Sequence, residues 1–208
     1  MPGILARPRG RFALRRRAYT KVGEVLKDLP TLETDRLILR KMTPDDAEAV
    51  FAYASDPEVT RYVIWETHRS IEDSRAFLDL AISKYRSGGE PDWGIVYKGD
   101  HRFVGTCGIV AWEPYHARAE LGYALSRDYW GRSFMAEAVC AMISFGFKKM
   151  NLNRVEARCI AENIASARVM EKAGMLYEGT LRQRELIKGE HRDIQVYSIL
   201  RDERRRRY

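Results

Sequence analysis

The sequence lacks the features that would place it in several large protein classes. No apolar run approaches the roughly 20 residues of a membrane-spanning helix, and no secretory hydrophobic segment follows the N-terminus. The three cysteines, Cys107, Cys140 and Cys159, are far apart, and neither a CxxC pair nor a Cys/His cluster occurs. We therefore expect free thiols in a reducing compartment, a cytoplasmic protein, no membrane contact and no metal site.

Charge is distributed unevenly along the 208 residues. The net charge is +7, and residues 1–23 hold seven basic residues and no acidic one, so the rest of the chain sums to zero. We divide the chain into a basic arm expected to be flexible (1–30), one domain (31–200) and a basic tail (201–208). Such arms are usually solvated. The alternatives are weak contact with RNA or the ribosome through phosphates and, for the first arm, a transit peptide, which its low serine content disfavours.

The middle of the chain alternates between strand and helix patterns. The 45% of hydrophobic residues suit one domain with a full core. The predicted order is a strand, two helices, three strands, a helix, a strand, a helix and two strands. These elements fall at 35–42, 43–54, 70–85, 92–98, 101–112, 117–125, 131–151, 154–160, 163–175, 176–187 and 191–200.

Helix ends and turns have recognisable signals. Thr43 and Ser70 are predicted N-caps, and Asp73 stands three residues after Ser70. Gly88 is predicted to end the second helix. Phe134, Ala138, Met142 and Phe145 recur at helical spacing, which predicts a buried stripe on the third helix.

A single glycine, Gly131, separates a strand from this third helix in the segment RDYWGRSFMAEA. The first turn of a helix has unpaired N–H groups and a positive dipole end, which together suit an anion. Gly131 removes a Cβ, Ser133 is small, and Arg132 is able to fork onto phosphate. Neither GxxxxGK[ST] nor GxGxxG occurs. The segment is therefore either a phosphate site or a glycine turn followed by a core helix.

A carboxylate lies in the central predicted strand. Glu120 shares a face with Gly122 and Ala124, because side chains alternate along a strand. Such a carboxylate either pairs with an arginine, with Arg118 and Arg158 as the candidates, or acts as a base. Both roles stay open at this point.

Several motifs together identify a family. ETDRLILRKMTPDDAEAVF, FVGTCGI, AELGYAL, YWGRSFMAEA and LNRVEARCIAENIASARVMEKAGM occur in this order. In this combination the chain resembles the RimJ/RimL branch of the GNAT N-acetyltransferases over roughly residues 33–200. The resemblance implies an α/β (α+β) fold with a mixed, mostly antiparallel sheet, a central splayed pair of parallel strands, and helices on both faces.

The resemblance also implies acetyl-CoA as the cofactor and suggests its binding residues. The pyrophosphate would bind backbone N–H groups of the glycine loop and the helix start, and the pantetheine arm would lie between the splayed strands. The Leu125 N–H would contact the thioester oxygen, Asn163 would hydrogen-bond the arm, and Ser166 would lie near the sulfur. The implied cofactor-binding residues are Tyr123, Leu125, Gly131, Arg132, Ser133, Phe134, Met135, Asn163 and Ser166. From the residues alone, Asn163 and Ser166 are an N-cap and a small first-turn residue, and both readings are compatible.

The sequence departs from the family pattern at three positions. Asp128 and Ser133 replace the first Gln/Arg and the last Gly/Ala of the loop pattern, which places phosphate binding on backbone amides and Arg132. Met170 stands where many members have a tyrosine acid, and it has no proton to donate. Ser166, or a water it holds, is then the candidate to protonate the leaving thiolate, and Glu120 is the candidate base.

Aromatic residues near loops point to an acceptor site only by resemblance. The segments YVIWETHRS and WEPYH would flank the acceptor, with Glu66 and Glu113 as acidic groups. Ordinary packing is the alternative for these aromatics, which are Trp65, Trp93, Trp112, Tyr115 and His116.

The reaction requires an uncharged primary amine. An α-amine with a pKa of ~8 is about 10% neutral at pH 7, whereas a lysine near ~10.4 is below ~0.1% neutral. We therefore expect a protein N-terminal α-amine as the acceptor, of the kind found on ribosomal proteins. The alternatives are a small amine such as a polyamine or antibiotic, and a non-catalytic acyl-CoA-binding or RNA-associated module. A monomer and a homodimer are both compatible with the sequence.

Overall fold

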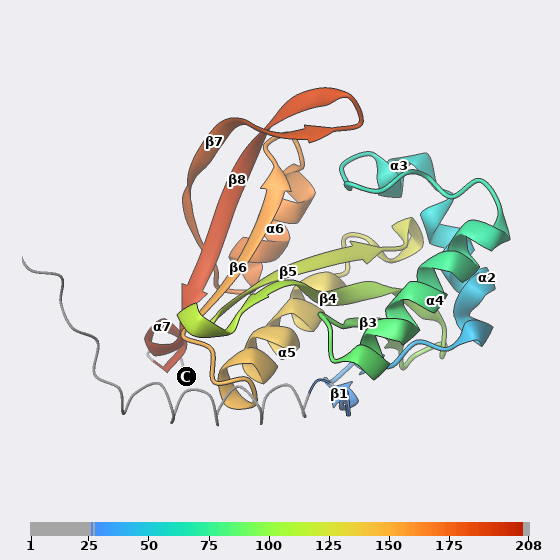
Figure 1. The fold of residues 1–208 in the computed structure, drawn as a ribbon, viewed down its shortest axis with the longest axis horizontal. Helices are drawn as coiled ribbons and strands as arrows, with labels where there is room; N and C mark the ends of the chain where they lie inside the picture. The colour runs from blue at the N-terminus through green and yellow to red at the C-terminus, as the bar shows by residue number, and fades with distance from the viewer. Residues whose placement is uncertain (1–25, 27, 206–208) are drawn as a thin grey trace, which may run out of the picture.

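The computed structural model describes residue 26 and residues 28–205 (Figure 1). Its sheet has eight strands in the order β1-β2-β3-β4-β5-β6-β8-β7. Among the described strands, only β5 and β6 pair in parallel; the other pairs are antiparallel. The strands are β1 (Leu32–Glu33), β2 (Leu37–Arg40), β3 (Asp92–Tyr97), β4 (Phe103–Glu113), β5 (Arg118–Leu125), β6 (Arg154–Ile160), β7 (Leu176–Ile187) and β8 (Glu190–Leu200). The expected mixed sheet with one central parallel pair is confirmed.

Helices cover both faces of this sheet, as expected (Figure 1). One buried cluster joins the strands to α5 and α6, and a second joins the opposite face to α2, α3 and α4. The helices are α2 (Ala47–Ala54), α3 (Pro57–Thr60), α4 (Ile71–Ser87), α5 (Phe134–Lys148), α6 (Ile164–Lys172) and α7 (Arg201–Arg205), with single 3-10 turns η1 (Pro44–Asp46), η2 (Pro114–His116) and η3 (Arg127–Tyr129). In the described part of the chain, no helix combines the length and the apolar character needed to cross a bilayer.

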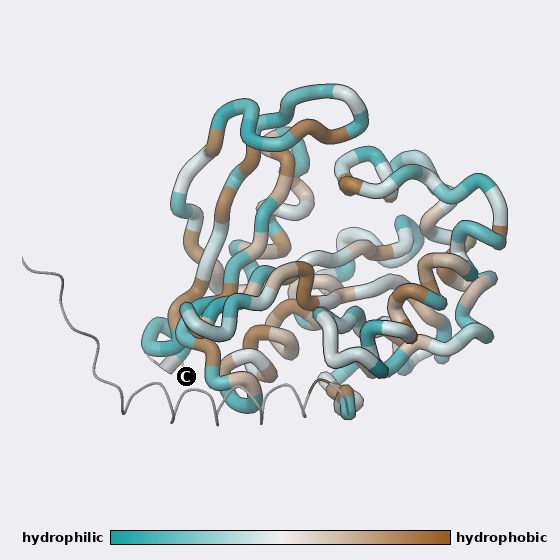
Figure 2. The backbone as a smooth tube through the Cα atoms, viewed as in Figure 1, coloured by the Kyte–Doolittle hydropathy of each residue, from teal (hydrophilic) through white to brown (hydrophobic). Residues whose placement is uncertain are grey.

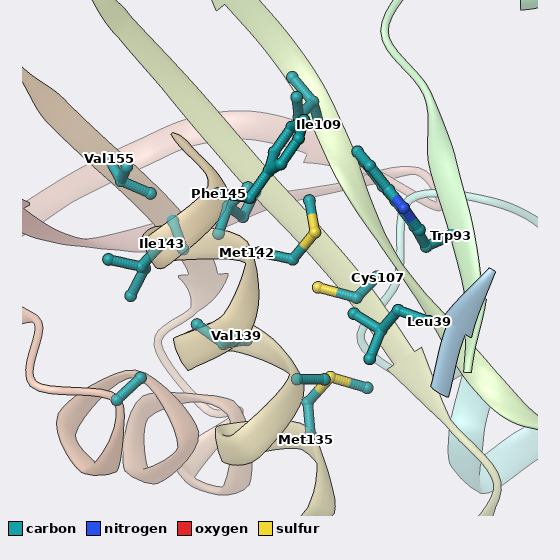
Figure 3. Packing of buried hydrophobic residues seen from close by; sticks show 14 of the residues in the cluster. Leu39, Trp93, Cys107, Ile109, Met135, Val139, Met142, Ile143, Phe145 and Val155 are labelled. Carbon is teal, nitrogen blue, oxygen red and sulfur yellow. The ribbon is translucent and has the colours of Figure 1, made fainter. Parts of the chain in front are cut away.

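Helix α5 supplies the centre of the larger core. All four residues of its predicted apolar stripe are buried. Met135, Met142 and Val139 point toward strand residues such as Cys107 and Ile109 (Figure 3). Each large apolar side chain buried in this way contributes roughly 1.5–3 kcal/mol. This packing fixes the position of the α5 N-terminus relative to the sheet.

Strands β5 and β6 separate along their length and form a fork (Figure 1). They pair from Arg118 with Arg154 to Leu121 with Ala157. Beyond this point β5 continues to Leu125 beside β4, while β6 continues to Ile160 beside β8. The expected splayed pair is confirmed, and the fork opens at the end nearest the α5 N-terminus.

Helix termini follow the predicted signals. Ser70 and Asp73 form a reciprocal capping box at the start of α4, and Gly88 ends the helix with a φ of 73°. Thr43 and Asp46 form a second capping box, although the first turn there is the 3-10 turn η1. Local chemistry therefore sets these boundaries.

Short elements are not predicted by the sequence patterns. These are β1, α3 and α7, which have only two to five residues each. Arg201, at the start of α7, donates from Nε to the Leu152 carbonyl at 2.7 Å, so the first turn of the basic tail contacts the domain. Leu26 and Leu29 lie in the core, although the sequence assigns them to the arm. Residues 1–25, 27 and 206–208 lie outside the described residues; they include nearly all of the arm, whose expected flexibility falls on them, and the last three residues of the tail.

Candidate active site

The loop at Gly131 leads from η3 into the N-terminus of α5. Gly131 has a φ of 73° and Ser133 a φ of 60°. Positive φ favours glycine at the first position. A Cβ built on Gly131 would meet no atom within 4 Å, so the space above the loop is open. The N–H groups of the first turn have no helical partner, and they adjoin this open space.

Charges around the loop favour an anion. Lys172 on α6 donates from Nζ to Ser133 Oγ at 2.9 Å, and Arg168 and Lys172 both line the adjoining cavity. The sequence analysis missed both residues, although their spacing of four places them on one face of α6. Phosphate binding at this position would be supported by these two cations as well as by the helix dipole.

The acidic residue in the first turn of α5 is neutralised. Glu137 accepts hydrogen bonds from Thr34 Oγ1 at 2.6 Å and from Arg36 N and Nε at 2.9 and 2.7 Å. Burial opposes its ionised form, but the hydrogen bonds from Thr34 and Arg36 outweigh burial and lower the pKa of Glu137. The carboxylate is therefore held by Arg36 and does not cancel the positive field of the helix start.

Arg132 is not directed freely into the open space. Its guanidinium lies over the rings of Tyr97, Tyr129 and Phe134, at 5.0, 5.6 and 4.6 Å from their centroids. Phe134 and Met135 have buried side chains, so only their backbone faces the loop. Of the predicted loop residues, Arg132 is the one that does not line the adjoining cavity.

A cavity of about 860 Å³ extends from this loop through the fork to the β7–β8 hairpin. Tyr123, Leu125, Asn163 and Ser166 all line it, together with Gly131 and Ser133. The structure therefore brings the predicted cofactor-binding residues other than Arg132 to one continuous space. Trp130 donates from Nε1 to the Leu125 carbonyl at 2.8 Å, which anchors the end of β5 beside the loop.

Ser166 lies at the start of α6 and faces the fork. Asn163 caps this helix, and its Oδ1 accepts from the Ser166 N–H at 3.1 Å. The Tyr123 hydroxyl lies 2.9 Å from Ser166 Oγ, within hydrogen-bond distance. Burial raises the pKa of Tyr123, partly offset by the hydrogen bond with Ser166, so the phenol stays neutral. Met170 is fully buried and does not line the cavity.

Glu120 is held by an arginine. Arg158 donates from Nε to Glu120 Oε1 at 2.8 Å and from Nη2 to Oε2 at 2.6 Å. The same guanidinium donates from Nη1 to Glu185 Oε1 at 2.9 Å. This bidentate ion pair matches one of the two roles that the sequence leaves open for Glu120, that of an arginine's partner. Arg118, the other candidate partner, contacts Glu113 and Glu156 instead.

The hairpin and α3 meet over the far end of the cavity. Lys188, in the turn between β7 and β8, donates from Nζ to the Thr60 carbonyl at 2.6 Å. Beneath this bond, Tyr62 packs against a small buried cluster of Ile160, Ile187 and Ile194. We call the Thr60–Lys188 bond and this cluster the roof. Figure 2 shows that much of the β7–β8 hairpin is hydrophilic, with a hydrophobic stretch beside its tip.

Only one of the two predicted acceptor segments reaches the cavity. Tyr62–Trp65 lines it, and Trp65 contacts His68 with ring centroids 5.5 Å apart. The other segment, Trp112–His116, ends β4 and forms η2, and none of its residues lines the cavity. Trp93 is fully buried in the core against Phe145. Of the five aromatic residues considered in the sequence, Trp65 lines the cavity, whereas Trp93, Trp112, Tyr115 and His116 do not and fit the alternative of ordinary packing.

Comparisons with known proteins agree with this architecture. A model of the family described as "Acetyltransferase (GNAT) domain" matches residues 36–176. "Uncharacterized N-acetyltransferase YoaA" of Bacillus subtilis (strain 168) is 39% identical over 172 residues, covering 83% of this chain and 97% of that protein. The ribosomal-protein-serine acetyltransferase of Escherichia coli (strain K12) is 26% identical over 134 residues, covering 64% and 74%. A crystal structure of a GNAT-family acetyltransferase from Bacillus anthracis matches with a TM-score of 0.75 and 31% identity, covering 83% of this chain and 99% of that one.

Proposed function

This chain belongs to the GNAT family of acetyltransferases, and we propose from that premise that its acceptor is the α-amine at a protein N-terminus. The family activity is the transfer of the acetyl group from acetyl-CoA to an amine. The finer assignment, to the RimJ/RimL branch, is part of the proposal. It is supported by the likeness to the E. coli ribosomal-protein-serine acetyltransferase.

The donor half of the cavity suits acetyl-CoA. In the proposal, backbone N–H groups from Gly131 to Met135 bind the pyrophosphate, and Arg168 and Lys172 add charge. The open space above Gly131 supports this role, because a phosphate would approach there without a steric barrier. Arg132 contributes its backbone N–H, while its guanidinium stays on the aromatic rings.

The fork receives the pantetheine arm and the thioester in this proposal. The arm pairs with β5 near Tyr123, and the Leu125 N–H contacts the thioester oxygen, where negative charge develops. Asn163 uses Oδ1 for its cap, which leaves its amide nitrogen for the arm. Ser166 donates toward the leaving sulfur, and the nearby Tyr123 hydroxyl holds the serine in place.

The observation that favours a chain end is the roof over the acceptor half. The bond between Lys188 and Thr60 joins the β7–β8 turn to α3, and Tyr62 and the three isoleucines of the cluster line the cavity there. A segment in the middle of a polypeptide would have to break this bond to enter, whereas a free terminus enters end-on. The higher neutral fraction of an α-amine at pH 7 favours it over a lysine side chain of similar width.

A panel of matched amines tests the proposal. One peptide has a free N-terminus and no lysine, a second is N-acetylated and has one lysine at its first position, and spermidine represents small amines. CoA release and product mass are measured with acetyl-CoA as donor. We expect kcat/KM for the free N-terminus to exceed both others at least tenfold. A preference for lysine or spermidine would reject the α-amine assignment.

The ribosomal part of the proposal has a separate test. Residues 1–23 supply the excess positive charge, and phosphate contacts of this kind weaken steeply as salt rises. Deleting residues 1–23 should lower acetylation of a ribosomal protein within the ribosome and leave acetylation of a free peptide unchanged. Equal activity of both enzymes on ribosomes would reject tethering by the arm.

A further inference from the structure

A second carboxylate, Asp92, faces the same cavity as Glu120. Asp92 opens β3 and pairs in register with Gly108 of β4, which in turn pairs with Gly122 of β5. Directly opposite residues in antiparallel strands share a face. Asp92 therefore lies on the same face of the sheet as Gly122 and Glu120. These three residues line the cavity.

The sequence makes room for this carboxylate. A Cβ on Gly108 would lie 2.2 Å from Asp92 Oδ1, so any other residue there would displace the carboxyl group. Because Gly108 has no side chain, the carboxylate lies over β4, in the wall of the cavity. Its backbone is also fixed, since the Tyr85 hydroxyl donates to the Asp92 carbonyl at 2.6 Å and accepts from the Met42 N–H at 3.1 Å.

Asp92 and Glu120 differ in how firmly their charges are neutralised. Glu120 receives two hydrogen bonds from one guanidinium, which bind both of its oxygens. The ion pair of Asp92 is a single contact, from Lys84 Nζ to Oδ2 at 3.2 Å. The Lys84 side chain is 34% exposed and that of Asp92 only 19%. Lys84 can therefore turn toward solvent, while Asp92 stays in the cavity wall.

The other titratable groups around Asp92 are neutral. They are Tyr85 on α4, Tyr53 on α2 and Cys107 on β4, and burial raises the pKa of each. Burial also raises the pKa of Asp92 itself, and Lys84 opposes this shift. A carboxylate in such surroundings is a stronger base than one in water.

We propose that Asp92 accepts the proton of the acceptor amine during acetyl transfer, and that Glu120 orients the cavity wall through Arg158. The inference rests on the proposed function, because it needs an amine in this cavity. The neutral amine nitrogen forms a bond to the thioester carbon and passes its extra proton to Asp92. The carbon–sulfur bond breaks, sulfur keeps the electron pair as a thiolate, and Asp92 releases the proton to solvent.

Three variants test the role directly. Asp92→Asn keeps the shape of the side chain and removes proton acceptance, and we expect kcat/KM to fall by about 10²–10⁴-fold. Glu120→Gln should lower it less than tenfold. Asp79→Asn makes the same change at an exposed position of α4 and should have no effect. Melting temperature and CoA affinity are measured for each. An Asp92→Asn enzyme that keeps more than a tenth of wild-type turnover would overturn the inference.

Lys84→Gln tests whether Asp92 acts as a base or only links β3 to α4 through its ion pair with Lys84. The pH dependence is measured with a peptide ending in an aminooxy group, which stays uncharged, so the acidic limb belongs to the enzyme. Lys84 lowers the pKa of Asp92, so removing its charge raises this pKa and moves the acidic limb to higher pH. If the acidic limb of the pH–rate profile does not move, or if kcat/KM falls as far as in Asp92→Asn, Asp92 has a structural role only and the inference is overturned.

These outcomes stay distinct from failure of the proposed function. If Asp92→Asn does not fold, the position of the acidic limb in the pH–rate profile of Lys84→Gln decides the question alone. An active wild-type enzyme with an active Asp92→Asn variant rejects the inference and leaves the proposed function intact. A wild-type enzyme that acetylates no amine would reject both.

Discussion

The half of the cavity beside the α5 N-terminus comes from two stretches of chain, β5 to α5 and the segment from Asn163 through α6, whereas the half under the hairpin comes from more widely scattered segments. In the first half, a positive-φ glycine and the N–H groups of a helix start form the surface that is proposed to bind the cofactor. In the second, side chains bridge long distances, such as Lys188 to Thr60 across 128 positions. The first half is therefore set by local geometry and the second by tertiary contacts.

This difference has consequences for substitution. A backbone site tolerates changes of most side chains but not of the residue that lets the ligand approach. In a wall of ion pairs and small apolar clusters, single substitutions are expected to change binding of the acceptor amine and to leave binding of acetyl-CoA intact. Variants in the two halves should consequently affect different kinetic constants.

The largest expected effect in the donor half is on the chemical step. Ser166→Ala removes the hydroxyl that is proposed to act on the leaving sulfur, which develops charge mainly in the transition state. We expect kcat to fall about a hundredfold, on the order of 2.7 kcal/mol, with little change in acetyl-CoA affinity. Pre-steady-state kinetics and calorimetric titration measure the two quantities. If kcat and acetyl-CoA affinity both fall by the same small factor, Ser166 is only a structural residue of the first turn of α6.

The next effect is on cofactor affinity. Gly131→Val introduces a branched side chain into the open space above the loop, and CoA affinity should fall at least tenfold, about 1.4 kcal/mol. Gly189→Val is the matched control, because Gly189 also has positive φ (82°) and open space, but lies in the β7–β8 turn. Both substitutions place a branched residue at a positive φ. Calorimetry showing equal CoA affinity in the two would contradict phosphate binding at Gly131.

In the acceptor half, Glu120→Gln should affect stability more than chemistry. The amide still accepts one hydrogen bond from Arg158, and Glu185 keeps its own contact with that guanidinium. We expect the free energy of unfolding to fall by about 1–2 kcal/mol, with an unchanged shape of the pH–rate profile. Chemical denaturation and kinetics from pH 5 to 9 check this. A hundredfold loss of turnover that recovers at high pH would instead make Glu120 the base.

The smallest effect should come from the roof. Lys188→Met removes the bond to the Thr60 carbonyl and keeps most of the side-chain length. We expect KM for the peptide acceptor to rise a few-fold and KM for acetyl-CoA to stay constant, because one partly exposed hydrogen bond is worth about 1 kcal/mol. Steady-state kinetics with each substrate varied in turn measure both. A change confined to acetyl-CoA would place this bond in the donor half.

The long elements of the fold were predictable because their periodic patterns are strong. The stripe on α5 and the capping residues Ser70 and Gly88 were all found where the sequence places them. The short elements α3 and β1 were missed, since two to four residues cannot show a period. Their residues are held by tertiary packing rather than by local preference: Val59 of α3 belongs to the second core, and Leu32 of β1 packs against the first.

The site divides in the same way. Gly131 and Ser166 could be singled out as candidates because they stand at strand–helix and turn–helix junctions with clear local signals, and both line the cavity. The pairing of Glu120 with Arg158 could not be chosen over Arg118, because all three positions alternate alike along their strands. Asp92 gave no signal, since its exposure to the cavity depends on the register of three strands.

The sequence by itself determined the family, the order of the long helices and strands, and the glycine-led helix start that suits a phosphate. These depend on periodicity, capping and backbone freedom, which act over a few neighbouring residues. The tertiary structure decided which carboxylate is tied to an arginine, which hydroxyl accompanies Ser166, and how the hairpin meets α3. These contacts join residues 38 to 128 positions apart. They exist only after the sheet has fixed its register, because register decides which side chains share a face.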